Sequence, residues 1–243
     1  MGCALCLANR PLLNSHIIPE FFFKQLYDNI HRFRVVPADP SQPEKFGQKG
    51  VREKLLCEIC EQKFSLWEKY AKEAFGEGRG VTIKREGDLF KLANLDYRRF
   101  RLFLLSLLWR MGVSKSDFFS QTSLGTKHEE ALRTALLNED PLEPLNYPCL
   151  MTAVHIGGKF CPDWISQPLH NKSGSYHCHS VVISGILFNF YVTSHAPPDF
   201  LNRVCLSKSN ELILSVSEIK DIPSLAEVAS DLCKAIRSRA KRV

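Results

Sequence analysis

Two pairs of cysteines, each with a two-residue gap, are the residues of this sequence best suited to chemistry. They are Cys3 with Cys6 and Cys57 with Cys60. A two-residue gap lets both sulfur atoms of a pair reach one metal ion at about 2.3 Å, and a second pair completes a tetrahedron without an open position. The spacing therefore predicts a structural zinc site that ties the two pairs together.

Two other interpretations of these cysteines stay open. They can be buried apolar residues, or one pair can form a redox couple. A polar segment at residues 15–19, which carries His16, lies between the two pairs and favours metal binding.

The chain divides into three expected segments that must position these residues. Glycines at residues 76–80 and prolines at residues 141–148 interrupt the periodic patterns. We therefore predict a zinc module at residues 1–78, a helical segment at 79–145 and a β-rich C-terminal domain at 146–243. The expected fold class is α+β, with the helical segment as a middle layer.

Apolar periodicity and capping residues predict the helices, and Asp96 is the expected N-cap of the middle helix. The expected helices are 20–29, 60–75, 97–111, 127–137 and a closing amphipathic helix at 223–240. Short apolar runs between Gly, Pro and Asn predict strands. The expected strands are 150–156, 180–186, 187–193, 203–206 and 211–215.

Composition places the chain among ordinary globular proteins. It has 243 residues, of which 44% are hydrophobic and 24% charged, which suffices for a sizeable core. The chain opens without a signal-like segment, and the apolar run at 102–109 is far shorter than the roughly 20 residues of a membrane helix. The five cysteines outside the pairs are scattered, which favours reduced thiols. We therefore expect a cytoplasmic protein without a membrane partner.

The net charge of +6 lies in one half of the chain. Residues 1–113 hold 19 Lys and Arg against 13 Asp and Glu, whereas residues 114–243 hold 13 of each sign. A basic surface attracts polyanions, so the first half is the expected contact region for nucleic acid. An ordinary solvated surface is the other interpretation of the same charge.

The order of these motifs resembles the zinc-bound ββα-metal fold of HNH endonucleases. The resemblance rests on Ser-His-Ile-Ile-Pro at residues 15–19 and on Leu-Leu-Cys-Glu-Ile-Cys-Glu at residues 55–61, and it covers residues 3–75. These two sequence motifs are most similar to those of bacterial HNH-like proteins. Some members of the broader family act in restriction and phage defence. What the resemblance implies is a metal-dependent nuclease, although a fold does not by itself fix a function.

By this resemblance His16 is the expected general base, which activates water while a magnesium or manganese ion binds the scissile phosphate. Imidazole suits this role because its ordinary pKa near 6.5 leaves it mostly neutral at working pH. The other interpretation of His16 is a residue that only braces the zinc module.

Three positions depart from the family pattern. The residue before the base is Ser15 instead of an acidic residue or His, the middle Asn falls on Val51 or Arg52, and Glu61 replaces the last His. A carboxylate is a hard oxygen ligand, so Glu61 is the candidate ligand of a catalytic magnesium or manganese ion. The other interpretation places Glu61 on the solvated border of an amphipathic helix.

Arginines supply the expected contacts to nucleic acid. Arg98, Arg99 and Arg101 on the middle helix, together with Arg52, are candidate phosphate ligands. The arginines of the middle helix can instead solubilise a core helix.

A histidine pair is a weaker signal. His177 and His179 share one face if their segment is a strand, but no third ligand is identified nearby. We interpret this pair as a surface or packing feature.

The leading hypothesis is an HNH-type endonuclease that hydrolyses phosphodiester bonds of nucleic acid, with DNA as the expected substrate. One alternative is a non-catalytic zinc-finger module that binds nucleic acid or a partner protein. Another is a scaffold subunit that docks onto a partner protein through the C-terminal domain.

Overall fold

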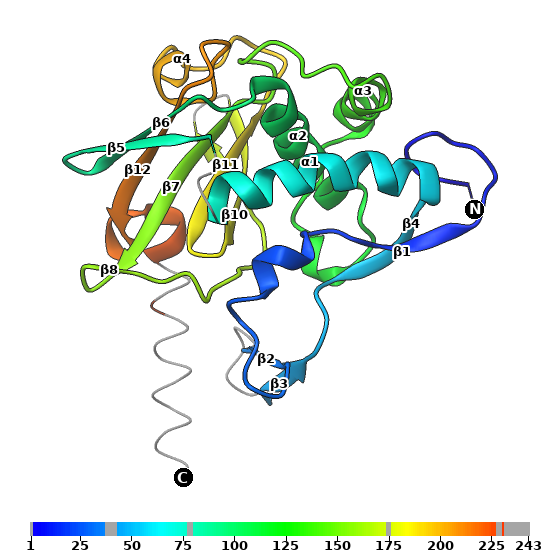
Figure 1. Ribbon diagram of the computed structural model, residues 1–243, viewed down its shortest axis with the longest axis horizontal. Helices are drawn as coiled ribbons and strands as arrows, with labels where there is room; N and C mark the ends of the chain where they lie inside the picture. Colours follow the sequence, from blue (N-terminus) through cyan, green and yellow to red (C-terminus); the bar gives the residue numbers. More distant parts are fainter. Residues whose placement is uncertain (1, 37–42, 77–79, 174–175, 227–229, 231–243) are drawn as a thin grey trace.

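A large mixed sheet, with helices packed against one of its faces, forms the body of the protein (Figure 1). The computed structural model describes residues 2–36, 43–76, 80–173, 176–226 and 230. The α+β class expected from the sequence is confirmed. None of the described helices is long and apolar enough to cross a membrane.

The large sheet has the strand order β5-β6-β12-β7-β11-β10-β9, and β8 pairs with β7 beside this path. Its strands are β5 (Thr82–Glu86), β6 (Leu89–Ala93), β7 (Cys149–Ile156), β8 (Lys159–Phe160), β9 (Leu169–Ser173), β10 (Tyr176–Ile183), β11 (Ile186–Val192) and β12 (Leu212–Glu218). Strands β12 and β7 are parallel, and the other neighbours are antiparallel. Ser184 and Gly185, both with positive φ, form the tight turn between β10 and β11.

The helices are α1 (Glu58–Gly76), α2 (Tyr97–Val113), α3 (Thr126–Leu137) and the short α4 (Leu201–Val204). Three 3-10 turns lie at Glu20–Phe23, Asp117–Phe119 and Ile219–Asp221. Helix α2 is the centre of the core, because every residue from Phe100 to Met111 is buried. The predicted N-cap is confirmed: the Asp96 carboxylate accepts a hydrogen bond from the Arg99 amide at 3.0 Å.

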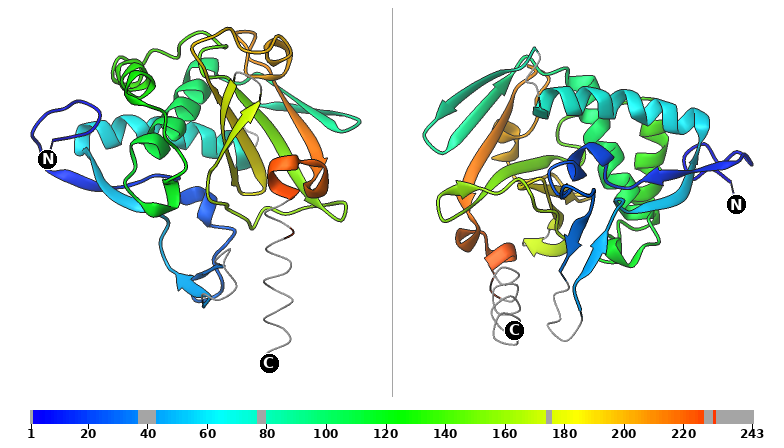
Figure 2. Two further views of the ribbon diagram at one scale, coloured as in Figure 1. Left: turned by 180° about the vertical axis from the view of Figure 1, so that it is seen from behind. Right: turned by 60° about the horizontal axis from the view of Figure 1, so that its bottom comes forward.

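Two small two-stranded sheets precede the large sheet in the sequence. Strand β1 (Leu12–His16) pairs with β4 (Arg52–Cys57) in antiparallel fashion, and α1 follows β4 directly. Strand β2 (Phe33–Val35) pairs with β3 (Lys45–Gly47). Figures 1 and 2 show this second hairpin projecting from the body, beside the β1–β4 pair. We call residues 24–51 the arm.

One buried cluster runs through all three expected segments, from Cys3 to Leu212. Aromatic rings join its parts: Phe22 lies 6.3 Å from Phe103 of α2, and Phe75 of α1 lies 6.2 Å from Phe188 of β11, measured between centroids. Alternate residues of the central strands face a second, smaller cluster on the opposite side of the sheet. The N-terminal segment with the paired cysteines, the helices and the sheet therefore share a core.

The helix expected at residues 20–29 is wrong beyond its first turn. Only Glu20–Phe23 is helical. Farther along, the Asp28 carboxylate accepts hydrogen bonds from the amides of Ile30 and Arg32, at 3.1 and 2.8 Å, and so stabilises a turn in place of a helix.

The strand expected at 203–206 is also wrong, because α4 occupies this place. The amides of Leu201 and Asn202 donate to the carbonyls of Pro198 and Asp199, which starts a helical turn. The expected helical segment at 79–145 begins with two strands, β5 and β6, that belong to the large sheet. The predicted closing helix at 223–240 lies largely outside the described residues.

Three histidine rings stack on one face of the sheet, at β9 and β10. The ring of His170 lies 5.2 Å from that of His177 and 4.9 Å from that of His179. His170 is thus a third imidazole beside the pair seen in the sequence. His179 is buried, and its Nδ1 has no hydrogen-bond partner among the described residues. Burial, followed by His170 and His177, lowers the pKa of His179 to about 4.

Because the folded-state pKa of His179 lies below the ordinary value of about 6.5, the unfolded chain binds the proton more tightly. Stability should therefore fall as the pH drops from 6.5 towards 4, by up to about 3 kcal/mol from this group. The variant His179→Gln should lose this part of the pH dependence, measured by urea unfolding at pH 7.5 and pH 5. Exposed His195→Gln is the control, and an unchanged pH dependence in His179→Gln would contradict the assignment.

Candidate metal centre and active site

The four paired cysteines converge at one end of the molecule. The sulfur atoms of Cys3, Cys6, Cys57 and Cys60 all lie within 4.8 Å of one another. The Sγ atoms of Cys6 and Cys57 are 3.8 Å apart, which equals the edge of a tetrahedron with metal–sulfur distances of about 2.3 Å. The predicted clustering is confirmed, and the donor set fits zinc. Among the described residues, this is the group with the spacing of a metal site.

Local structure explains how each pair reaches the centre. The first pair lies on a tight turn in which the Leu7 amide donates to the Cys3 carbonyl at 2.8 Å. Cys57 ends β4, and Cys60 lies in the first turn of α1. The Cys57 amide also donates to Cys3 Sγ at 3.3 Å. This hydrogen bond joins the first pair of cysteines directly to the second.

The thiols of the cluster influence one another. Burial raises the pKa of Cys57, but hydrogen bonds from the Cys60 backbone and from the neighbouring thiols outweigh burial and lower this pKa to about 7. Burial and the same neighbours raise the pKa of Cys60. A cluster that already favours one thiolate suits a cation, because metal binding requires the thiols to lose their protons.

A polar site begins where β1 faces α1. The buried Ser15 hydroxyl donates to Glu61 Oε2 at 2.7 Å and accepts from the Leu56 amide at 3.2 Å. Glu61 is half-buried on the first turn of α1, next to Cys60. Ser15, the residue before the expected base, and Glu61, the candidate metal ligand, are therefore in direct contact.

His16 ends β1 and lies opposite Arg52 of β4. Its Nε2 lies 2.8 Å from Glu20 Oε2, and Arg52 Nη2 donates to the same carboxylate oxygen at 3.4 Å. The Tyr27 hydroxyl donates to the other oxygen of Glu20. All four side chains are partly exposed, so the group is a surface network at the base of the arm.

Electrostatics favour a neutral His16. Burial, and then the charge of Arg52, lower the pKa of His16, while Glu20 and Glu68 oppose this shift. Burial raises the pKa of Glu20, but the bonds from Tyr27, His16 and Arg52 outweigh it and lower this pKa. At neutral pH the network therefore contains a neutral imidazole beside a carboxylate.

A buried arginine of α2 fixes the backbone at this site. Arg110 Nη1 donates to the His16 carbonyl at 2.8 Å and to Glu68 Oε1 at 2.6 Å. The guanidinium also lies 5.4 Å from the centre of the Phe64 ring, measured from Cζ. Glu68, which lies two turns after Glu61 on α1, is thus paired with a core cation.

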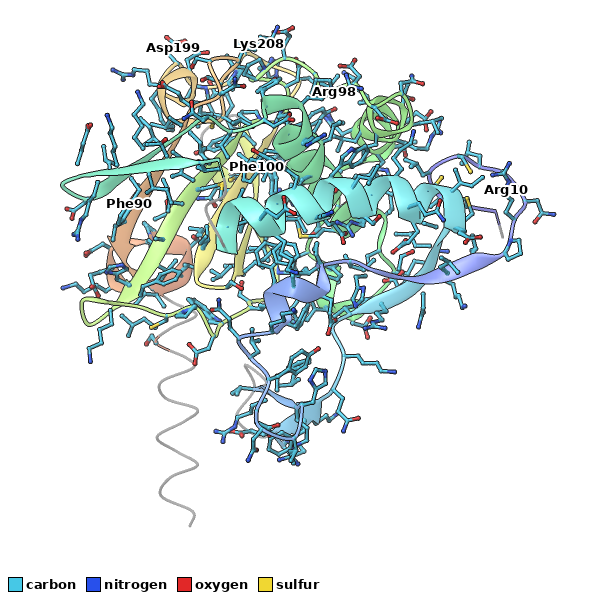
Figure 3. All side chains as sticks on the ribbon, in the orientation of Figure 1. Arg10, Phe90, Arg98, Phe100, Asp199 and Lys208 are labelled. Carbon is cyan, nitrogen blue, oxygen red and sulfur yellow. The ribbon has the colours of Figure 1, made fainter. Side chains whose placement is uncertain are left out.

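The candidate phosphate ligands are not brought together. Arg52 lies in the His16 network, whereas Arg98 and Arg99 are exposed at the start of α2, just before the buried Phe100 (Figure 3). The expectation of an exposed Arg101 is wrong, because only 1% of this residue is exposed. Its guanidinium donates to the carbonyls of Tyr147 and Asn146, so it fixes the chain before β7.

Sequence reasoning missed Glu20, Tyr27 and Arg110. The spacing of His16 and Glu20 offered a signal, since residues four apart can pair on a helical turn, and Pro19 places such a turn there. Nothing local pointed to Arg110, which lies 94 residues from His16 and inside an apolar run. Comparison of the chain with protein-family models, with curated proteins and with solved structures finds no match.

The purified protein should carry about one zinc ion per chain, measured by elemental analysis. The variant Cys57→Ser should lose this zinc and unfold at a lower temperature, because metal affinity is part of the folding free energy of such sites. The control is Cys161→Ser, since Cys161 lies outside the cluster. A folded wild-type chain without bound metal would contradict the assignment.

Proposed function

We propose that this protein is a metal-dependent endonuclease of the HNH type that hydrolyses phosphodiester bonds of nucleic acid, with DNA as the first substrate to test. The observation that carries the proposal is the contact between Ser15 and Glu61 beside the cysteine cluster, with His16 next to Ser15 at the end of β1. These side chains come from a strand end and a helix start that are separated by about 45 residues in the sequence.

The order of elements supports this proposal. An antiparallel pair, β1 and β4, leads into α1, and the cysteines join the start of the chain to the junction of β4 and α1. The same order of elements is what the resemblance to HNH endonucleases implies. By that resemblance Ser15 and Glu61 stand at metal-ligand positions, and the contact of Ser15 Oγ with Glu61 Oε2 at 2.7 Å supports this assignment.

In this proposal His16 is the general base. A proton on Nε2 is held by the Glu20 carboxylate, which leaves the lone pair of Nδ1 to accept a proton from water. The lowered pKa of His16 keeps this nitrogen unprotonated at neutral pH. Glu20 and Tyr27 position the ring, and Arg110 holds the His16 backbone through its carbonyl.

Glu61 is the residue proposed to hold magnesium or manganese. Its carboxylate supplies the hard oxygen that these ions prefer, and the Ser15 hydroxyl is its neighbour. When bound, such an ion binds a phosphate oxygen and stabilises the leaving oxygen. Arg52 is proposed as a phosphate contact because it is a partly exposed cation at the same end of the hairpin.

A non-catalytic module that binds nucleic acid is the second candidate. It is favoured by one observation: the carboxylates of Glu20, Glu61 and Glu68 each accept a hydrogen bond from a protein side chain. Each of these bonds uses one of the acceptor positions of its carboxylate, so a purely structural role explains the three contacts as well as a metal site does. Cleavage assays separate the two candidates.

If His16 is the base, His16→Ala should lower the rate of metal-dependent DNA cleavage by about 100-fold to 10,000-fold. Zinc content, thermal unfolding and DNA affinity should stay close to wild type. The reason is that the His16 side chain accepts a proton from water in this proposal and is not a ligand of the zinc ion. The control is His195→Ala, a change at an exposed histidine. Equal cleavage by wild type and His16→Ala would exclude this role, and absence of cleavage by the wild type would favour the binding module.

If Glu61 holds the catalytic ion, Glu61→Ala should reduce cleavage, and higher magnesium or manganese concentrations should restore part of the rate. The matched control is Glu58→Ala, since Glu58 is exposed in the same turn of α1. The measurement is the cleavage rate against metal concentration. A loss that no metal concentration relieves would argue against the ligand role.

A further inference from the structure

The arm carries a basic surface that the proposed chemistry leaves unused. Residues 24–51 hold five Lys and Arg against three Asp and Glu, and Arg52 and Lys54 follow directly. Two of the acidic residues pair within the arm, Asp28 with Arg32 at 3.1 Å and Glu44 with Arg34 at 3.4 Å. The described arm therefore has a surplus of cations on an element that projects from the body (Figure 2).

Three lysines of the arm are free to contact a ligand. Lys24, Lys45 and Lys49 are exposed, and none of them forms an ion pair with a carboxylate in the described part of the chain. Exposed lysines on a projecting element attract phosphates, since neutralised phosphates release their counterions.

One face of the β2–β3 hairpin combines cations with an aromatic ring. Arg34 and Phe46 are direct cross-strand partners, and both are exposed, the Arg34 side chain by 64% and Phe46 by 57%. Arg32 lies over the Phe46 ring at 4.3 Å from Cζ to the centroid. Exposed cations beside an exposed aromatic ring are typical of surfaces that bind single-stranded nucleic acid, because the ring offers a stacking surface for an unpaired base.

Packing on the other face of the hairpin holds this arrangement. Phe33 lies against Gly47, where a Cβ atom would come within 2.5 Å of the Phe33 ring. The ring of Phe33 also lies 5.5 Å from Phe23 and 6.0 Å from Tyr27. Because Phe33 faces inwards, its neighbours in the sequence, Arg32 and Arg34, face outwards with Phe46.

The base of the arm is the His16 network. The chain enters the arm after Glu20, returns to Arg52, and Tyr27 of the arm bonds to Glu20. A strand bound along the arm would thus lead towards the proposed general base.

We propose that the outward face of the arm, formed by Arg32, Arg34 and Phe46, binds a single-stranded segment of nucleic acid. Phosphates contact the cations, and an unpaired base stacks on Phe46. Charge complementarity and the exposed ring identify this ligand, since bases inside a duplex offer no free face. The inference rests on the proposed function only for the class of substrate.

The test is binding of a labelled oligothymidylate of about 20 nucleotides, longer than the usual site of a single-strand binding fold, followed by fluorescence anisotropy. Divalent cations are omitted, so that no cleavage is needed. Phe46→Ala should weaken binding by about 5-fold to 150-fold, as expected for loss of one stacked base, with an unchanged salt dependence. The double variant Arg32→Ala/Arg34→Ala should reduce the slope of log affinity against log salt by about 1.4.

The matched controls are Phe160→Ala and Lys159→Ala, because β8 presents an exposed Lys-Phe pair away from the arm. Both should bind like the wild type, and thermal unfolding verifies that each variant is folded. If binding depends on the arm but the wild type cleaves no nucleic acid in a separate assay with magnesium or manganese, this inference stands and the proposed hydrolysis is excluded. Equal binding, or equal cleavage, by the wild type and both arm variants would overturn this inference and leave the proposed hydrolysis untouched. A preference for duplex DNA that Phe46→Ala leaves unchanged would overturn it as well.

Discussion

The guanidinium of Arg110 connects the three parts of the structure that surround His16. It is buried to 1% exposure on α2, and it donates to a carboxylate of α1 and to the last carbonyl of β1. A buried charge is tolerated only with such partners, and removing one partner of a buried pair costs about 3–5 kcal/mol. The hairpin end, α1 and α2 therefore hold one another in place. Any chemistry at His16 depends on this contact, because Arg110 fixes its backbone.

The sequence predicted those features of the fold that depend on residues close to one another in the chain. The cysteine pairs cluster as expected, because a two-residue gap determines where two sulfur atoms point. The pattern at 60–75 predicted α1, and Asp96 predicted the start of α2. A capping carboxylate and an apolar stripe act within a few residues, so they can be read without knowledge of the fold.

The failures have physical causes that lie outside the local pattern. Strand β5 was missed because all its side chains are exposed, so it lacks the alternation of a half-buried strand. Arg101 was placed on the surface, although α2 is buried on all sides from Phe100 to Met111 and Arg101 bonds to carbonyls of a distant segment. The partners of His16 were missed for the same reason, since Arg110 and Arg52 reach it only through the fold.

The charges around His16 couple the arm to the polar site. Glu20 accepts hydrogen bonds from His16, from Arg52 of β4 and from Tyr27 of the arm. A phosphate near Arg52 would compete with Glu20 for this cation and weaken their contact, which at 3.4 Å is already long. Glu20 would then interact more strongly with His16, because fewer cations would share its charge. Since an anionic neighbour raises the pKa of an imidazole, a phosphate at this place would make His16 a stronger base.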